Sequence, residues 1–78
     1  RITYQKMGMV KYNAFREMSG DLSYALALLD QRENGFVINS VYAKEGGYSY
    51  IKEIVNGESS IPLSEEEQAA LDNAKSQS

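Results

Sequence analysis

The chain has 78 residues with no Cys and no His, and its eight basic and eleven acidic residues give a formal net charge of −3. This length fits one domain with a thin core, which the absence of Cys leaves without disulfide support. The acidic balance argues against nucleic acid as a partner and against direct contact with an anionic membrane surface, because both need a basic face. A metal site would need oxygen ligands alone, and we expect no cofactor.

The chain starts at Arg1 and enters a patterned segment almost at once. We therefore expect a single domain over residues 1–78 that forms the C-terminal part of a longer parent protein. No apolar stretch reaches the roughly 20 residues that span a bilayer. The last residues, 76–78, are polar, and we expect them to fray.

β-forming residues dominate the first part of the chain, in runs separated by turn signals. The first run, Ile2–Phe15, alternates loosely, Gly8 indicates a bulge or bend, and the turn cluster Ser19–Asp21 follows. The run Leu22–Leu29 is rich in Ala and Leu, which favour helix, but the turns around it and a pairing run nearby favour a strand. Phe36–Tyr42 is a strand by composition.

Three further segments complete the chain before its tail. Tyr48–Val55 is a fourth strand, and Glu58–Ile61 is the candidate for a short fifth one. The pattern then changes to helical over Glu65 to about Lys75, where Ser64 and Glu67 have the spacing of a capping box. The apolar face of this helix, Ala70, Leu71 and Ala74, is small.

The dipeptide Asn34-Gly35 sets the predicted register, since it favours a tight hairpin turn with positive φ. A two-residue loop pairs Leu28 with Val41, and a four-residue loop keeps the same parity. One face then carries Tyr24, Leu26, Leu28, Val37, Val41, Tyr48, Tyr50 and Ile54. The other carries Ala27, Leu29, Phe36, Ile38, Tyr42, Ile51 and Val55.

Both predicted faces are apolar, whereas an antiparallel sheet usually leaves one face polar. The short helix is too small to cover both. We therefore predict an α+β fold: an antiparallel β-meander of four to five strands, curled towards a partial barrel, with one C-terminal helix. Either the barrel or a surface outside this chain covers the remaining face.

The charged segments give no metal site. Asp30–Gly35 resembles the start of a calcium loop, but Arg32 and Val41 stand where that loop needs oxygen ligands. The consecutive carboxylates of Glu65–Glu67 point to different sides of a helix, so a solvated first turn is favoured over a cation site. We expect no specific binding of zinc, calcium or duplex DNA.

Catalysis has little support in the sequence. Without His or Cys, the Ser–His and Cys–His pairs of nucleophilic enzymes cannot form. The carboxylates are spread over turns and strand ends without a recognisable pairing, at Asp21, Asp30, Glu53 and Glu58. We expect the chain not to be an enzyme.

Three stretches resemble a bacterial family known as domain of unknown function 4446. They are Val10–Phe15, Gly20–Asp30 and Pro62–Glu67, with the two Asn-Gly turns between them in the expected order. The segment Ala43–Tyr48 departs from the more charged connection of that family. The resemblance implies a longer, membrane-anchored bacterial parent with a helical segment before this domain, and it implies no activity, cofactor or catalytic residue.

The leading functional prediction is a non-catalytic protein-interaction module presented at a membrane, binding an unknown protein or a second copy. Its candidate interaction face holds Leu29, Ile38 and Tyr42. The alternative is a small-ligand domain whose pocket is lined by Tyr24, Tyr50 and also Tyr42. Tyr offers apolar area with a polar tip, which suits a binding face, but ordinary cross-strand pairing of half-buried tyrosines is the favoured explanation of the six tyrosines.

Overall fold

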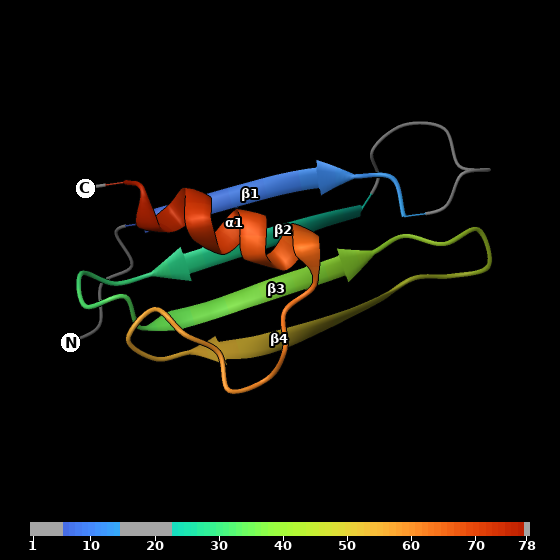
Figure 1. Cartoon of the computed structure of the whole chain (residues 1–78). Coiled ribbons are helices and arrows are strands. Elements are labelled where there is room, and N and C mark those ends of the chain that lie inside the picture. Colours follow the sequence, from blue (N-terminus) through green and yellow to red (C-terminus); the bar gives the residue numbers. More distant parts are fainter. Residues whose placement is uncertain (1–5, 15–22, 78) are drawn as a thin grey trace.

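Four antiparallel strands lie side by side in chain order and one helix crosses them, in a computed structural model that describes residues 6–14 and 23–77. The elements are β1 (Lys6–Tyr12), β2 (Ser23–Leu29), β3 (Gly35–Val41), β4 (Tyr48–Ile54) and α1 (Glu65–Lys75) (Figure 1). The predicted α+β meander with a C-terminal helix is therefore confirmed, and the sheet is not closed into a barrel. The start and end of the predicted first run and the predicted turn at residues 19–21 lie outside the described residues.

The hairpin between β2 and β3 has a different register from the predicted one. Its loop is Asp30–Asn34, and Leu29 pairs with Gly35 and Leu28 with Phe36. The left-handed residue is Glu33, with φ 64°, whereas Gly35 begins the next strand. A loop of five residues reverses the parity that loops of two or four residues share, so the predicted pairing of Leu28 with Val41 is wrong.

The second Asn-Gly pair forms the turn that its sequence predicts. Asn56 and Gly57 have φ of 53° and 79°, and Val55 and Glu58 exchange backbone hydrogen bonds of 2.9 and 3.0 Å. Positive φ at both central residues defines a type I′ turn. Val55 and Glu58 form an isolated bridge, and in the described part of the chain no fifth strand follows at the predicted place.

The helix begins as the sequence predicts. Ser64 is the N-cap, its hydroxyl accepts from the Glu67 N–H at 3.2 Å, and the Glu67 carboxylate accepts from the Ser64 N–H at 2.7 Å. Ser76 closes the helix. The side chain of Gln77, in the tail expected to fray, accepts from the Met7 N–H at 3.0 Å and donates to the Met7 carbonyl on the edge strand β1.

The helix lies against one face of the sheet, mainly over β1 and β2 (Figure 1). Gly8 permits this contact, because a Cβ at that position would lie 2.2 Å from the carbonyl oxygen of Ala70. β1 pairs with β2 without interruption through Gly8, so the predicted bulge is absent. Gly8 is needed where the two backbones meet.

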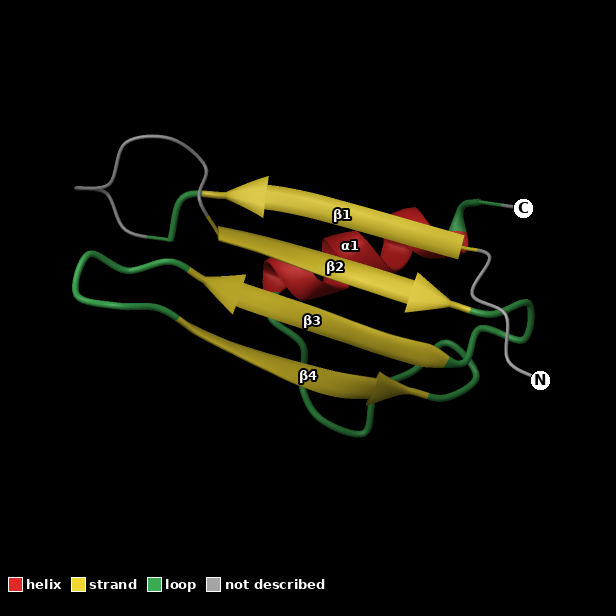
Figure 2. Ribbon diagram, turned by 180° about the vertical axis from the view of Figure 1, so that it is seen from behind, coloured by secondary structure: helices red, strands yellow, loops and turns green. Residues whose placement is uncertain are grey.

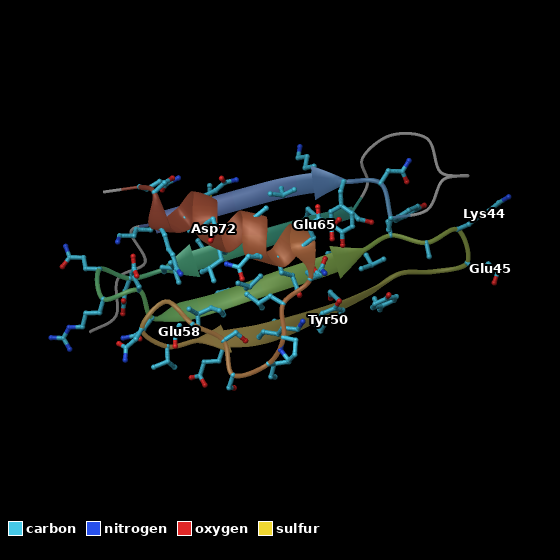
Figure 3. The ribbon with its side chains drawn as sticks, viewed as in Figure 1. Lys44, Glu45, Tyr50, Glu58, Glu65 and Asp72 are labelled. Atoms are coloured by element: carbon cyan, nitrogen blue, oxygen red, sulfur yellow. The ribbon has the colours of Figure 1, made fainter. Side chains whose placement is uncertain are left out.

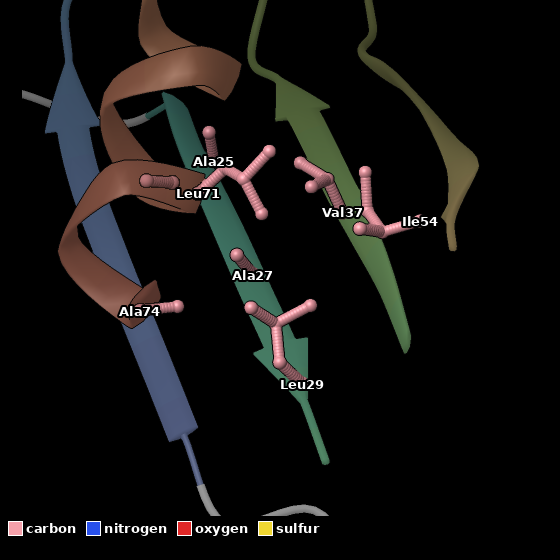
Figure 4. Packing of buried hydrophobic residues seen from close by; sticks show 8 residues of the cluster. Ala25, Ala27, Leu29, Val37, Ile54, Leu71 and Ala74 are labelled. Atoms are coloured by element: carbon pink, nitrogen blue, oxygen red, sulfur yellow. The ribbon is translucent and has the colours of Figure 1, made fainter. Parts of the chain in front are cut away.

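The core is the layer between α1 and the sheet. Figure 4 shows its buried apolar side chains, drawn from β2, β3, β4 and α1. Many of them are small, and the largest are Leu29, Ile54 and Leu71. The buried cluster consists of Ala25, Ala27, Leu29, Val37, Ile54, Ala70, Leu71 and Ala74.

Candidate functional site

The face of the sheet opposite the helix, here called the open face, carries large apolar side chains. Figure 2 shows this side of the molecule, with the helix behind the strands. Because side chains alternate along a strand, the register aligns the open-face residues of all four strands into rows. The rows are Met7, Leu28, Phe36 and Glu53; Met9, Leu26, Ile38 and Ile51; and Lys11, Tyr24, Ser40 and Ser49.

Water reaches this face across all three rows. Met7 is 49% exposed, Met9 43% and Ile51 65%. In β2 and β3 the open-face side chains are half-buried, apart from Tyr24, which is 37% exposed, whereas their immediate neighbours Ala25, Ala27 and Val37 are completely buried under the helix. No helix or strand of the described part packs over the open face (Figures 1 and 2). It is therefore a largely apolar surface, with charged side chains at two of its corners.

A polar cluster lies on the helix-covered face, at the helix N-terminal end. The Tyr12 hydroxyl donates to Asn39 Oδ1 at 2.6 Å, and Asn39 Nδ2 donates to the Tyr50 hydroxyl at 3.2 Å. The bond between Tyr12 and Asn39 passes over β2, where small side chains at Ser23 and Ala25 leave room. Asn39 is 2% exposed, and these bonds satisfy its amide. Burial raises the pKa of the Tyr12 phenol against the opposing effect of the Asn39 hydrogen bond.

Glu67 and Lys52 form an ion pair next to this cluster. Lys52 Nζ lies 2.8 Å from Glu67 Oε1 and also donates to the Pro62 carbonyl at 2.9 Å. It lies 5.2 Å from the centre of the Tyr50 ring. Burial works to raise the pKa of the Glu67 carboxyl, but the hydrogen bonds from Lys52 and from the Ser64 N–H outweigh it and lower that pKa below its ordinary value.

This cluster has the character of a structural network. Its hydrogen bonds join β1, β3, β4 and α1, and Glu67 is completely buried. The predicted solvated first turn is thus wrong for Glu67. The sequence does contain one signal for it, since Glu67 is the N3 residue of the capping box and is therefore held against the chain.

The predicted interaction residues do not share one face. Leu29 is fully buried beneath the helix, so its grouping with Ile38 is wrong, and the reversed hairpin parity is the reason. Ile38 lies in the middle row of the open face. Tyr42 follows the end of β3, is 48% exposed, and donates its N–H to the Ser23 hydroxyl at 2.9 Å.

The predicted ligand-facing tyrosines also separate. Tyr24 lies on the open face, whereas Tyr50 lies on the opposite face, in the polar cluster and stacked on Tyr48 with ring centres 6.0 Å apart. They cannot line one pocket. An open recess elsewhere, beside the end of β4, is lined by Glu53, Val55, Glu58, Ser59 and Ser60.

A metal site and a membrane-spanning helix are both absent from the described residues. Within residues 6–14 and 23–77, no group of three or more Asp or Glu side chains is placed to hold a metal ion. Across that same part of the chain, the single helix is neither long nor apolar enough to cross a membrane. Lys44 and Glu45 project at the tip of the β3–β4 connection, away from the polar cluster and the open face (Figure 3).

A four-stranded antiparallel meander with a helix on one face and an apolar surface on the other defines a small α+β domain. Sequence comparison gives the family: residues 1–75 match the family described as "Protein of unknown function (DUF4446)", and the chain belongs to it. This confirms the resemblance inferred from the sequence. No curated protein and no solved structure matches the chain.

Proposed function

We propose that this domain is a non-catalytic protein-interaction module and that the open face is its binding surface. The observation that carries the proposal is the continuous apolar middle row of that face, Met9, Leu26, Ile38 and Ile51, which the described part of the chain leaves uncovered. Monomeric proteins rarely expose contiguous apolar patches larger than a few hundred Å², and the largest patch on a protein is often functional.

The residues of the open face have the composition of an interface. Its centre is aliphatic, Phe36 and Tyr24 lie beside that centre, and its charged residues, Lys11 and Glu53, lie at the margin. Binding sites between proteins commonly combine an apolar, aromatic centre with a polar rim. Burial of apolar surface contributes about 25 cal/mol per Å², so covering the exposed parts of these side chains would supply a real driving force.

Two observations support binding over catalysis or ligand capture. The chain lacks His and Cys, and the buried polar residues of the described part, Ser23, Asn39 and Glu67, make bonds that join elements of the fold, although Glu67 Oε2 has no hydrogen-bond partner. Tyr24 and Tyr50 lie on opposite faces, which leaves the ligand-pocket alternative without a common site. Presentation of this module at a membrane, implied by the resemblance, remains part of the proposal.

Site-specific photocrosslinking in the cells that make the protein tests the proposal. A photoreactive phenylalanine analogue replaces Ile51 on the open face or, as the control, Asp72 on the exposed side of the helix. Both positions are accessible, so they sample solvent equally. We expect protein adducts from Ile51 alone. Equal adducts from both positions, or none from Ile51, would contradict a binding role for the open face.

A further inference from the structure

We infer that the open face binds the open face of a second copy of this chain, with the strands of the two sheets crossing at about 90°. The inference rests on the proposed function and names its partner. It starts from the two charged residues of the face. Lys11 lies at the end of the outer strand β1, and Glu53 lies on the other outer strand, β4, in the opposite outer row. The two charges therefore occupy diagonally opposite corners.

The patch is about as wide across the strands as it is long along them. Four strands spaced about 4.8 Å apart place β1 and β4 about 14 Å from each other. The outer rows are four residues apart along a strand, which is also about 14 Å at about 3.4 Å per residue. The patch is nearly square, so a second patch turned by a quarter covers it as fully as one aligned with it.

The charges select the crossed arrangement. A two-fold axis that lies between the sheets along the other diagonal, from the Met7 corner to the Ser49 corner, exchanges the Lys11 and Glu53 corners. Lys11 of each copy then stands opposite Glu53 of the other, and two ion pairs form. Aligned packing instead places Lys11 and Glu53 opposite uncharged corners. Because β-sheets twist, two crossed sheets move apart at two opposite corners. Long charged side chains such as those of Lys11 and Glu53 can reach across that wider gap, whereas short side chains cannot.

The area sets the strength of this dimer. Including the side chains at its margin, the patch measures about 20 Å on a side, so two copies bury on the order of 800 Å². Stable complexes usually bury about 1,200 to 2,000 Å², and smaller interfaces belong to weak or transient complexes. We therefore expect a reversible dimer with a dissociation constant in the micromolar to millimolar range.

Charge exchange provides the test, by sedimentation equilibrium of the 78-residue chain over low micromolar to low millimolar concentrations. In Lys11→Glu, each copy presents Glu at both corners, and in Glu53→Lys, each copy presents Lys at both. We expect each single variant to dimerise about five- to tenfold more weakly, because two exposed attractive pairs become repulsive. Lys44→Glu makes the same charge change at the tip of the β3–β4 connection and should leave dimerisation unchanged.

Mixing the two single variants makes the test specific for the crossed geometry. A heterodimer of Lys11→Glu with Glu53→Lys restores both opposite-charge pairs, so the mixture should dimerise as tightly as the original chain, within about twofold. Unfolding measurements on each variant verify that the fold is kept. A strictly monomeric original chain, or a mixture no tighter than the single variants alone, would overturn the inference. If crosslinks from Ile51 then reach a different protein, the interaction module stands and only its proposed partner is wrong.

Discussion

Where α1 crosses β1 and β2, the helix-covered face of the sheet carries mostly small side chains, whereas the middle row of the open face carries only large ones. Beneath α1 lie Gly8, Ala25 and Ala27, and the helix meets them with Ala70 and Ala74. The sequence suggests that so small an apolar helix cannot hide a sheet face. The helix indeed covers only part of that face: it packs on β1 and β2, where small residues on both sides let the backbones come close, and it leaves Tyr48 and Tyr50 of β4 exposed. The open face has large apolar residues and no such cover in the described part of the chain.

Truncating neighbouring leucines in β2 should give the largest effect. Leu29 is fully buried beneath the helix, and Leu28 lies half-buried on the open face. We expect Leu29→Ala to lower the free energy of unfolding by about 3 kcal/mol. Leu28→Ala should lower it by about 1 kcal/mol, because less of that side chain is removed from water. Urea unfolding at low micromolar concentration measures both. Equal losses would mean that the two faces are buried alike.

A methyl group at Gly8 tests whether close backbone contact holds the covered face. Its Cβ would lie 2.2 Å from Ala70 O and 2.6 Å from Ala74 N, so α1 would have to move. We expect Gly8→Ala to destabilise the fold by about 2 kcal/mol. Met9→Ala, the next residue on the open face, is the control and should cost less. A neutral Gly8→Ala variant would show that the helix can shift freely on the sheet.

The contribution of the Glu67 charge to the stability of the helix-covered face should depend on pH. Its pKa is lowered in the folded chain, so its contribution is present above the ordinary value of 4.5 and is lost as pH falls through the folded pKa. Glu67→Gln keeps a capping side chain and removes the charge. It should cost about 1–2 kcal/mol at neutral pH.

Unfolding at neutral pH and below the folded pKa of Glu67 provides the measurement. The difference between Glu67→Gln and the original chain should shrink at the acidic pH, because Glu67 is then protonated. Glu65→Gln, in the same helical turn but exposed, serves as the control. A difference that stays constant between the two pH values would mean that the ion pair with Lys52 contributes nothing.

The smallest effect on stability belongs to the open face. Ile51 is 65% exposed, and Ile51→Ser should change the free energy of unfolding by no more than about 0.5 kcal/mol at low concentration. The same variant should weaken self-association, because Ile51 belongs to the apolar middle row. Sedimentation and unfolding on one sample separate the two effects. A large loss of stability without change in association would place Ile51 in the monomer's own core.

The order and type of the elements were predictable because their signals are local. The capping box of Ser64 and Glu67 and the strand composition of β3 each depend on few neighbours. Register depends on loop length. The dipeptide Asn34-Gly35 predicts a loop of two or four residues, whereas the loop Asp30–Asn34 has five. The Asp30 carboxylate organises that loop instead, accepting from the backbone N–H groups of Arg32 and Asn34 at 2.8 and 3.0 Å.

The candidate site was only partly predictable. Composition predicted apolar residues on both sheet faces, and Ile38 lies on the open face, where it was expected if the helix covers the other face. Leu29 was misplaced because one residue in loop length exchanges the two faces of a strand. The bond between Tyr12 and Asn39 could not be predicted, because it joins β1 to β3 across the small side chains of β2, and these two strands are not neighbours.

The contact between the first strand and the last helix governs the order in which this domain can be completed. Met7 is bonded to Gln77, 70 residues later, and α1 rests on Gly8. At synthesis rates of about 5–20 residues per second, the ribosome needs roughly 4 to 14 s to add the residues between β1 and the end of α1. Until then the three hairpins can pair, but the sheet has two bare apolar sides. During translation the face that α1 covers therefore stays open to water until the helix has been made, so the nascent meander exposes more apolar surface than the finished domain.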